Sequence, residues 1–257
     1  MCGYLSSLVL RSSLLTAALL LFVSASQAQD TFSIVAVDPA TGEVGSAGAS
    51  CVDLFAKGRA DVDFIGDLVP GIGVVITQAK YDSTNQVNAR ARMLAGDSPT
   101  EIIAWLRAND AEGNDSIRQY GVVRLMHGGA QAAAHTGAAC PNYAGSRVGP
   151  NYSIQGNILL GPAVLDSMEA RFLRTPGPLA ERLMSAMQGA NVIGADSRCA
   201  ANRSSALFAF LKVAAPTDSI PSILLGLRTH GGAMIEPIDS LQTLFNVTLQ
   251  PSPAPRR

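Results

Sequence analysis

The sequence predicts an α+β fold in which helices lie outside two stacked sheets. Strand-like and helix-like segments occur in separate blocks: strands, two helices, strands, two helices, strands and one helix. Segregated blocks are typical of α+β proteins, whereas strict alternation of strands and helices indicates a parallel sheet. Hydrophobic residues make up 47% of the chain and charged residues only 15%, which favours a densely packed core.

The strands are recognised by alternating or continuous apolar residues between turn-forming Gly, Pro, Asn and Asp. The first two form a hairpin, because the turn chemistry of Asp38–Gly42 separates them. The predicted strands cover residues 31–37, 44–49, 72–79, 119–125, 131–136, 153–159, 206–213 and 223–229.

The helices are recognised by apolar side chains that repeat every three or four residues and by capping residues. The clearest start is at Ser98, which caps the helix, while Pro99 takes the first helical position and Glu101 completes a capping box. The predicted helices cover residues 85–94, 99–107, 164–172, 179–187 and 238–245.

The first 28 residues have the features of a secretory signal peptide. Arg11 precedes an apolar run over residues 14–23, and Ser26-Gln27-Ala28 provides small residues for signal peptidase. This run is shorter than the ~20 apolar residues of a transmembrane helix, and no later stretch reaches that length. We expect cleavage after Ala28, no membrane span, and an exported protein that is periplasmic or secreted. A membrane-anchored start is the alternative.

The remaining chain has the length of one domain. No internal repeat or linker divides residues 29–250, and residues 251–257 have the composition of a disordered tail. The formal net charge is −1, and no stripe of Lys and Arg is present, so we predict no nucleic-acid partner. A homo-oligomer is compatible with the sequence.

Three cysteines remain after the leader: Cys51, Cys140 and Cys199. One disulfide is expected in an exported protein, and we favour Cys140–Cys199 because both residues follow loop-like segments. The alternative is three buried thiols that pack as small hydrophobic residues. Neither the cysteines nor the three histidines have the spacing of metal ligands, so we predict no metal and no other cofactor.

Six strings of residues resemble those of one family. They are TFSIVA from Thr31, TQA from Thr77, RQYGVV from Arg118, AHTG from Ala134, YSIQGN from Tyr152 and GADSR from Gly194. The chain thereby resembles DUF1028, a family of uncharacterised bacterial and archaeal proteins placed with the N-terminal-nucleophile (Ntn) hydrolases. The resemblance covers the mature chain and implies a four-layer αββα sandwich.

Thr31 is the candidate nucleophile, since in an Ntn hydrolase the first residue carries both the attacking hydroxyl and the free amine that activates it. Cleavage after Ala28 leaves Gln29 and Asp30 in front of Thr31. A second trimming step is therefore required, such as self-cleavage of the Asp30–Thr31 bond. Without it, Thr31 is only a strand residue.

Two further residues are candidates for the catalytic machinery. Ser50 follows the second strand, where its hydroxyl would tune the Thr31 amine or bind substrate; the alternative is an ordinary turn residue. His135 would act as a general acid or base near neutral pH; the alternative is a structural histidine.

The remaining candidates are substrate-binding residues. Gln78, Gln155 and Asn157 are amides that would stabilise an oxyanion or bind a polar ligand, or else form a buried network. Arg198 would bind a substrate carboxylate, with Asp196 converging on the same place, or the two would form a local salt bridge.

The sequence thus predicts an exported Ntn-type hydrolase that cleaves an amide bond of a small-molecule amide or a peptide. The alternative is a non-catalytic binding or accessory module of the cell envelope on the same fold.

Overall fold

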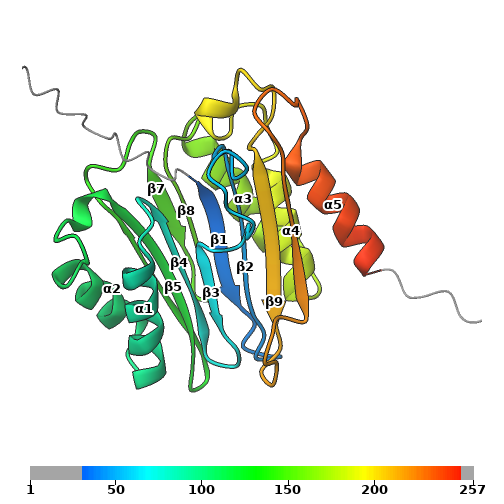
Figure 1. The fold of residues 1–257 in the computed structure, drawn as a ribbon. Coiled ribbons are helices and arrows are strands. Elements are labelled where there is room, and N and C mark those ends of the chain that lie inside the picture. Colours follow the sequence, from blue (N-terminus) through cyan, green and yellow to red (C-terminus); the bar gives the residue numbers. More distant parts are fainter. Residues whose placement is uncertain (1–30, 250–257) are drawn as a thin grey trace, which may run out of the picture.

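The computed structural model describes residues 31–249, so the predicted signal peptide and C-terminal tail lie outside the described residues. Within this range the chain forms two antiparallel sheets and five α-helices, in the predicted order of blocks (Figure 1). The α+β class is therefore confirmed. No helix in this part of the chain is long and apolar enough to cross a membrane.

The six-stranded sheet has the first two strands of the chain at its centre, and every neighbouring pair is antiparallel. From edge to edge it contains β10 (Ile223–Arg228), β9 (Phe208–Ala214), β2 (Val44–Ser50), β1 (Phe32–Val37), β8 (Tyr152–Gly156) and β7 (Gly145–Val148).

The four-stranded sheet follows the order of the chain. It contains β3 (Gly66–Val69), β4 (Gly73–Ala79), β5 (Arg118–Met126) and β6 (Gly129–Thr136). Strands β3 and β7 were not predicted from the sequence. Each has only four residues, which is too short to show a period of two.

Five helices and two short 3₁₀ turns complete the described chain. They are α1 (Ser83–Ala95), α2 (Pro99–Ala108), η1 (Asp115–Ile117), α3 (Pro162–Arg174), α4 (Leu179–Gly189), η2 (Ser197–Cys199) and α5 (Pro237–Thr248). The predicted capping box is present at α2: Ser98 Oγ accepts from the Glu101 amide at 3.3 Å, and Glu101 Oε2 accepts from the Ser98 amide at 2.8 Å.

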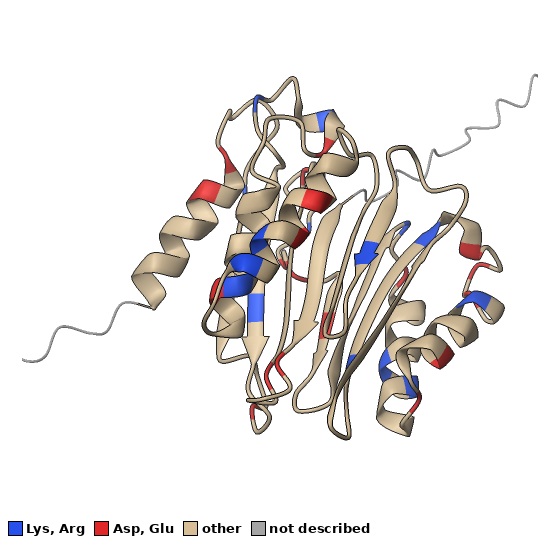
Figure 2. Ribbon diagram, turned by 180° about the vertical axis from the view of Figure 1, so that it is seen from behind, with Lys and Arg blue, Asp and Glu red and all other residues tan. Residues whose placement is uncertain are grey.

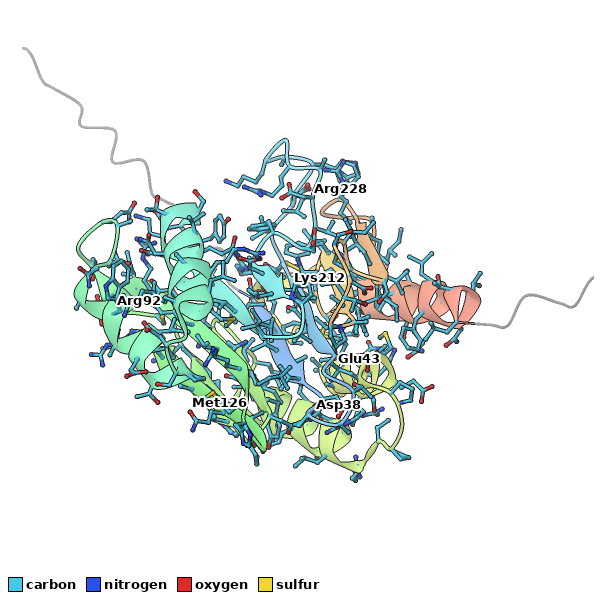
Figure 3. All side chains as sticks on the ribbon, turned by 90° about the horizontal axis from the view of Figure 1, so that it is seen from below. Asp38, Glu43, Arg92, Met126, Lys212 and Arg228 are labelled. Atoms are coloured by element: carbon cyan, nitrogen blue, oxygen red, sulfur yellow. A yellow bond between two sulfur atoms is a disulfide. The ribbon has the colours of Figure 1, made fainter. Side chains whose placement is uncertain are left out.

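Three apolar clusters hold these elements together. One lies between the two sheets and includes Val35, Val44 and Ile76. A second packs the four-stranded sheet against α1 and α2, and a third packs the six-stranded sheet against α3, α4 and α5. Side chains fill the space between the sheets when the molecule is viewed from the end that carries Asp38 and Glu43 (Figure 3).

Charged side chains of both signs are scattered over the helices and loops rather than gathered in one stripe (Figure 2). The strands carry few charges, and one of them is nearly buried. Lys212 of β9 lies 7% exposed, with its Nζ 2.6 Å from Asp63 Oδ2 and 2.8 Å from the Gly66 carbonyl. This contact ties the loop between β2 and β3 to the six-stranded sheet.

Candidate functional site

Thr31 lies directly before the central strand β1. The pairings of β1 with β2 and with β8 end at Phe32. One residue earlier, the same two registers place Thr31 between Ser50 of β2 and Asn157, which follows β8. The Asn157 amide donates a 3.2 Å hydrogen bond to the Thr31 carbonyl, so the pairing with β8 continues to Thr31.

The side chain of Thr31 faces the four-stranded sheet. Val35 and Val37 of β1 belong to the cluster between the sheets, and residues two or four apart on a strand share a face. Ser50 and Asn157 occupy the same row, where neighbouring Cβ atoms lie ~4.5–5.5 Å apart. Thr31 is only 1% exposed, so a substrate reaches its hydroxyl only after the surrounding chain changes.

A buried network of amides connects this row to the four-stranded sheet. Gln78 of β4 donates from Nε2 to the Thr31 carbonyl at 3.1 Å and to Gln119 Oε1 at 2.7 Å. Its Oε1 accepts from the Ser33 hydroxyl at 2.5 Å, and that hydroxyl accepts from Gln155 Nε2 at 2.7 Å. Hydrogen bonds between the sheets therefore hold the start of β1 in place.

Backbone carbonyls fix the orientation of these amides. Gln119 Nε2 lies 3.0 Å from the Gly156 carbonyl and 3.2 Å from the Gly145 carbonyl, and a carbonyl only accepts hydrogen bonds. Gln119 Oε1 must therefore face Gln78 and Asn157. Asn157 meets it with Nδ2 at 3.0 Å, which leaves Asn157 Oδ1 pointing elsewhere.

The three predicted amides consequently differ in what they can offer a ligand. Gln78 uses both Nε2 hydrogens inside the network, so it has none for an oxyanion. Gln155 bonds to Ser33 through Nε2 and to Ser153 through Oε1. Asn157 Oδ1 is buried without a hydrogen-bond partner, and an unmet acceptor of this kind costs about 1–3 kcal/mol.

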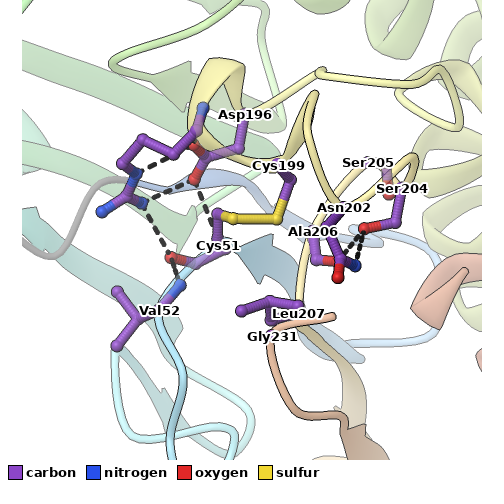
Figure 4. The surroundings of a disulfide bond; sticks show 12 residues. Cys51, Val52, Asp196, Cys199, Asn202, Ser204, Ser205, Ala206, Leu207 and Gly231 are labelled. Carbon is purple, nitrogen blue, oxygen red and sulfur yellow. Dashed lines mark hydrogen bonds and ion pairs between the residues drawn. A yellow bond between two sulfur atoms is a disulfide. The ribbon is translucent and has the colours of Figure 1, made fainter. Parts of the chain in front are cut away.

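A second polar cluster surrounds Asp196 and Cys51 (Figure 4), directly after Ser50 in the chain. Asp196 is fully buried, and its carboxylate accepts from Arg198 Nε at 3.0 Å and Nη2 at 2.6 Å. It also accepts from the Cys51 amide at 2.8 Å. Arg198 Nη2 lies 3.5 Å from Ser50 Oγ. The local salt bridge considered from the sequence is thus present, and it joins η2 to the end of β2.

The predicted disulfide is wrong in one partner. Cys199 of η2 is bonded to Cys51, with their Cα atoms 5.6 Å apart. Cys140 instead carries a buried thiol that donates to the Arg118 carbonyl at 3.3 Å. The reason is topological: Cys140 follows β6 in the four-stranded sheet, whereas η2 lies against the end of β2 in the six-stranded sheet.

His135 does not join the candidate site. Its register partner Tyr120 belongs to the cluster under α1 and α2, whereas the next residue, Thr136, pairs with Gln119 on the inner face. The His135 ring lies 3.1 Å from the Asp115 carbonyl. The expectation that His135 lies beside Thr31 is therefore wrong, because its side chain is on the face of the four-stranded sheet that points away from Thr31.

Gln119 is a functional candidate that the sequence reasoning missed. It is fully buried and bonds to amides or carbonyls from three strands. Gln119 lies directly opposite Gln78 on the neighbouring strand, but α1 and α2 separate the two strands along the chain, so the sequence alone does not reveal that the two amides face each other.

A buried charged cluster lies behind the four-stranded sheet. Arg118 and Asp110 have side chains that are both 1% exposed, with Arg118 Nε 2.7 Å from Asp110 Oδ2. Burial alone would raise the pKa of Asp110, but hydrogen bonds from Arg118, Asn85 and two backbone amides hold it well below its ordinary value. No group of three or more His, Cys, Asp or Glu within residues 31–249 is placed to hold a metal ion.

Comparisons with known proteins identify a family and several similar solved structures. The family described as "Family of unknown function (DUF1028)" matches residues 31–229. A DUF1028 protein from Silicibacter pomeroyi, known from a crystal structure, is 22% identical with a TM-score of 0.67, covering 87% of this chain and 91% of that one. Anbu (ancestral beta-subunit) from Yersinia bercovieri is 10% identical with a TM-score of 0.43, covering 85% of this chain and 94% of that one. No functionally curated protein matches.

Proposed function

Because the chain belongs to DUF1028, a family of unknown function, its activity has to be inferred from the site, and we propose that it is an exported hydrolase with Thr31 as nucleophile. The bond cleaved is an amide of a small molecule or a peptide. The observation that carries this proposal is the position of Thr31 on the middle strand, between Ser50 and Asn157. Its carbonyl accepts from both the Asn157 amide and Gln78, which fixes the main chain of the nucleophile.

In the proposed mechanism, Thr31 supplies both the nucleophile, its hydroxyl, and the base, its α-amine. Once the Thr31 amine is free, it takes the proton from Oγ1 as the oxygen attacks the amide carbonyl carbon. The protonated amine then donates that proton to the leaving nitrogen, which leaves an ester on Thr31. Water hydrolyses the ester, with the amine again accepting a proton. The Ser50 hydroxyl, beside Thr31 in the same row, contacts the nucleophile or the substrate.

The proposal requires that the residues before Thr31 are removed. Self-cleavage accomplishes this without another enzyme. Thr31 Oγ1 attacks the Asp30 carbonyl carbon, and the peptide C–N bond breaks as the hydroxyl proton passes to the Thr31 nitrogen. Water then hydrolyses the resulting ester between Asp30 and Thr31. The burial of Thr31 in the longer chain supports such a step, since the uncut chain presents no accessible nucleophile.

Two further observations support the wider proposal. The sheets face each other with helices on their outer sides (Figure 1), an arrangement that fits the four-layer αββα sandwich of the Ntn hydrolases. The Cys51–Cys199 disulfide supports export to the periplasm or the medium, because structural disulfides persist in oxidising compartments.

A non-catalytic binding module is the second candidate. Arg198 is paired with Asp196, and both Nε2 hydrogens of Gln78 are used inside the protein. These contacts account for the burial of the polar groups without a substrate, which favours the binding module. In that case Thr31 would keep its peptide bond and serve only as the residue before β1.

Hydrolysis of a panel of small amides and dipeptides separates the two candidates. We expect Thr31→Ser to retain turnover and Thr31→Ala to lose at least about 10³-fold, the scale of removing a nucleophile. Thr41→Ala, in the exposed turn after β1, is the matched control and should behave as wild type. Equal turnover by Thr31→Ala and wild type would contradict the proposal.

A further inference from the structure

Asn157 combines two properties that are unusual together. Its side chain is fully buried, yet Oδ1 has no hydrogen-bond partner. Buried side-chain acceptors are nearly always paired, and a native exception calls for an explanation. The orientation is not arbitrary, because the backbone carbonyls of Gly145 and Gly156 fix Gln119 and Gln119 fixes Asn157.

The unmet acceptor lies beside the proposed nucleophile. The Asn157 backbone amide bonds to the Thr31 carbonyl at 3.2 Å, and the two side chains share one face on adjacent strands. Gln78 contacts both the Thr31 carbonyl and the Gln119 oxygen that binds Asn157. A donor that appears on Thr31 is therefore added directly beside the residue that carries the unmet acceptor.

We propose that Asn157 is a positioning residue whose Oδ1 accepts a hydrogen bond from the α-amine of Thr31 once that amine is free. The inference rests on the proposed function, because the amine exists only after cleavage before Thr31. A neutral amine has two hydrogens and one lone pair. With one hydrogen held by Asn157 Oδ1, the amine cannot turn freely, and its lone pair is directed at the Thr31 hydroxyl.

The same contact has an electrostatic consequence. The ammonium form donates a stronger hydrogen bond than the neutral amine, so Asn157 stabilises the protonated state. It raises the pKa of the α-amine above the ~7.7–8.0 of an unperturbed chain terminus.

Other charged groups near this end of β1 are already paired. Asp196 binds Arg198. Further out, Asp53 lies 3.9 Å from His230. Behind the four-stranded sheet, Arg118 binds Asp110 and Glu112, and Lys80 binds Glu112. None of these pairs includes Asn157 or a residue to which Asn157 is hydrogen-bonded.

The test is a titration of the Thr31 amine in the exported, mature protein. The N-terminal peptide is followed by mass spectrometry after brief exposure to acetic anhydride at a series of pH values, and the rate of acetylation against pH gives the pKa. The variants are Asn157→Leu and Asn157→Ser. The matched control is Gln155→Leu, which removes a buried amide from the same face of β8, two residues earlier.

We expect both Asn157 variants to lower the pKa of the Thr31 amine by about one pH unit, the scale of one hydrogen bond to a charged group. Gln155→Leu should leave it unchanged. Thermal melting shows which of the two Asn157 variants fold, and either folded variant is sufficient for the test.

An amine pKa that is the same in wild type and in the folded Asn157 variants overturns the inference and leaves the nucleophile proposal standing. A mature wild-type protein in which Thr31 is never the first residue overturns both. The two failures are thus distinguished by the identity of the N-terminal peptide.

Discussion

The backbone amide of Cys51 donates a 2.8 Å hydrogen bond to the carboxylate of Asp196, although 145 residues separate them along the chain. The bond joins the end of β2, next to Ser50, to the turn η2. The Cys51–Cys199 disulfide and the contact from Arg198 to Ser50 join the same two segments. This joint defines one flank of Thr31, and the amide network around Gln119 defines the other.

Removing the disulfide should destabilise the fold. The bridge closes a loop with a sequence separation of 148, for which the chain-entropy model gives a contribution of about 5 kcal/mol. We expect Cys51→Ser combined with Cys199→Ser to lower the free energy of unfolding by this amount in urea titrations. Cys140→Ser is the control that leaves the bridge intact. Identical midpoints for wild type with and without a reductant that cleaves the bridge would show that the disulfide contributes nothing.

Asp196→Asn should cost about 2–3 kcal/mol of stability. The variant removes the charge that pairs with Arg198, whose side chain is 31% exposed and therefore partly hydrated. The matched control is Asp166→Asn, because Asp166 is 56% exposed in its pair with Arg147 and exposed pairs contribute less than about 1 kcal/mol. Equal urea midpoints for the two variants would contradict a structural role for the Asp196–Arg198 pair.

Gly121→Ala tests the packing between the sheets. A Cβ atom at Gly121 would lie 2.1 Å from Gln155 Oε1 and 3.0 Å from Ser153 Oγ, so the Gln155 amide has to move. We expect a loss of about 2 kcal/mol in urea titrations. Gly129→Ala is the control, since nothing lies within 4 Å of its added Cβ. A Gly121→Ala protein as stable as the control would mean that Gln155 is not held as described.

Stability should fall in acid through Asp110. Because the folded-state pKa of Asp110 is lowered, the group stabilises the fold above its unfolded pKa of about 3.9, and this contribution is lost as the pH falls towards the folded value. Urea midpoints between pH 7 and pH 3 should therefore decline more steeply for wild type than for Asp110→Asn. Parallel curves would contradict the assignment.

The sequence predicted features whose cause is local. The capping box at Ser98 and Glu101 depends on residues three apart. Thr31 was identified at the start of a predicted strand, Ser50 directly after one, and Asn157 as an amide within one. The row that they form follows from antiparallel pairing at the centre of the sheet.

Features that depend on long-range arrangement were missed. The sequence does not show on which face of the sheet His135 lies. Strand β6 has alanines at 130, 132, 133 and 134, so both faces carry small apolar residues and no alternation of polar and apolar positions identifies the inner face. The partner of Cys199 depends on which strand end η2 approaches, and spacing does not encode that. The internal pairing of Gln78 depended on Gln119, whose register was unknown until the sheet was seen.

The most direct test of the central claim is the N-terminus of the mature, exported protein. We predict an N-terminal peptide that begins at Thr31. Brief treatment with periodate should oxidise it, because periodate cleaves the 1,2-amino alcohol of an N-terminal threonine but leaves an internal threonine intact. A fully exported protein that begins stably at Gln29, and whose N-terminal peptide keeps its mass in periodate, would contradict the account.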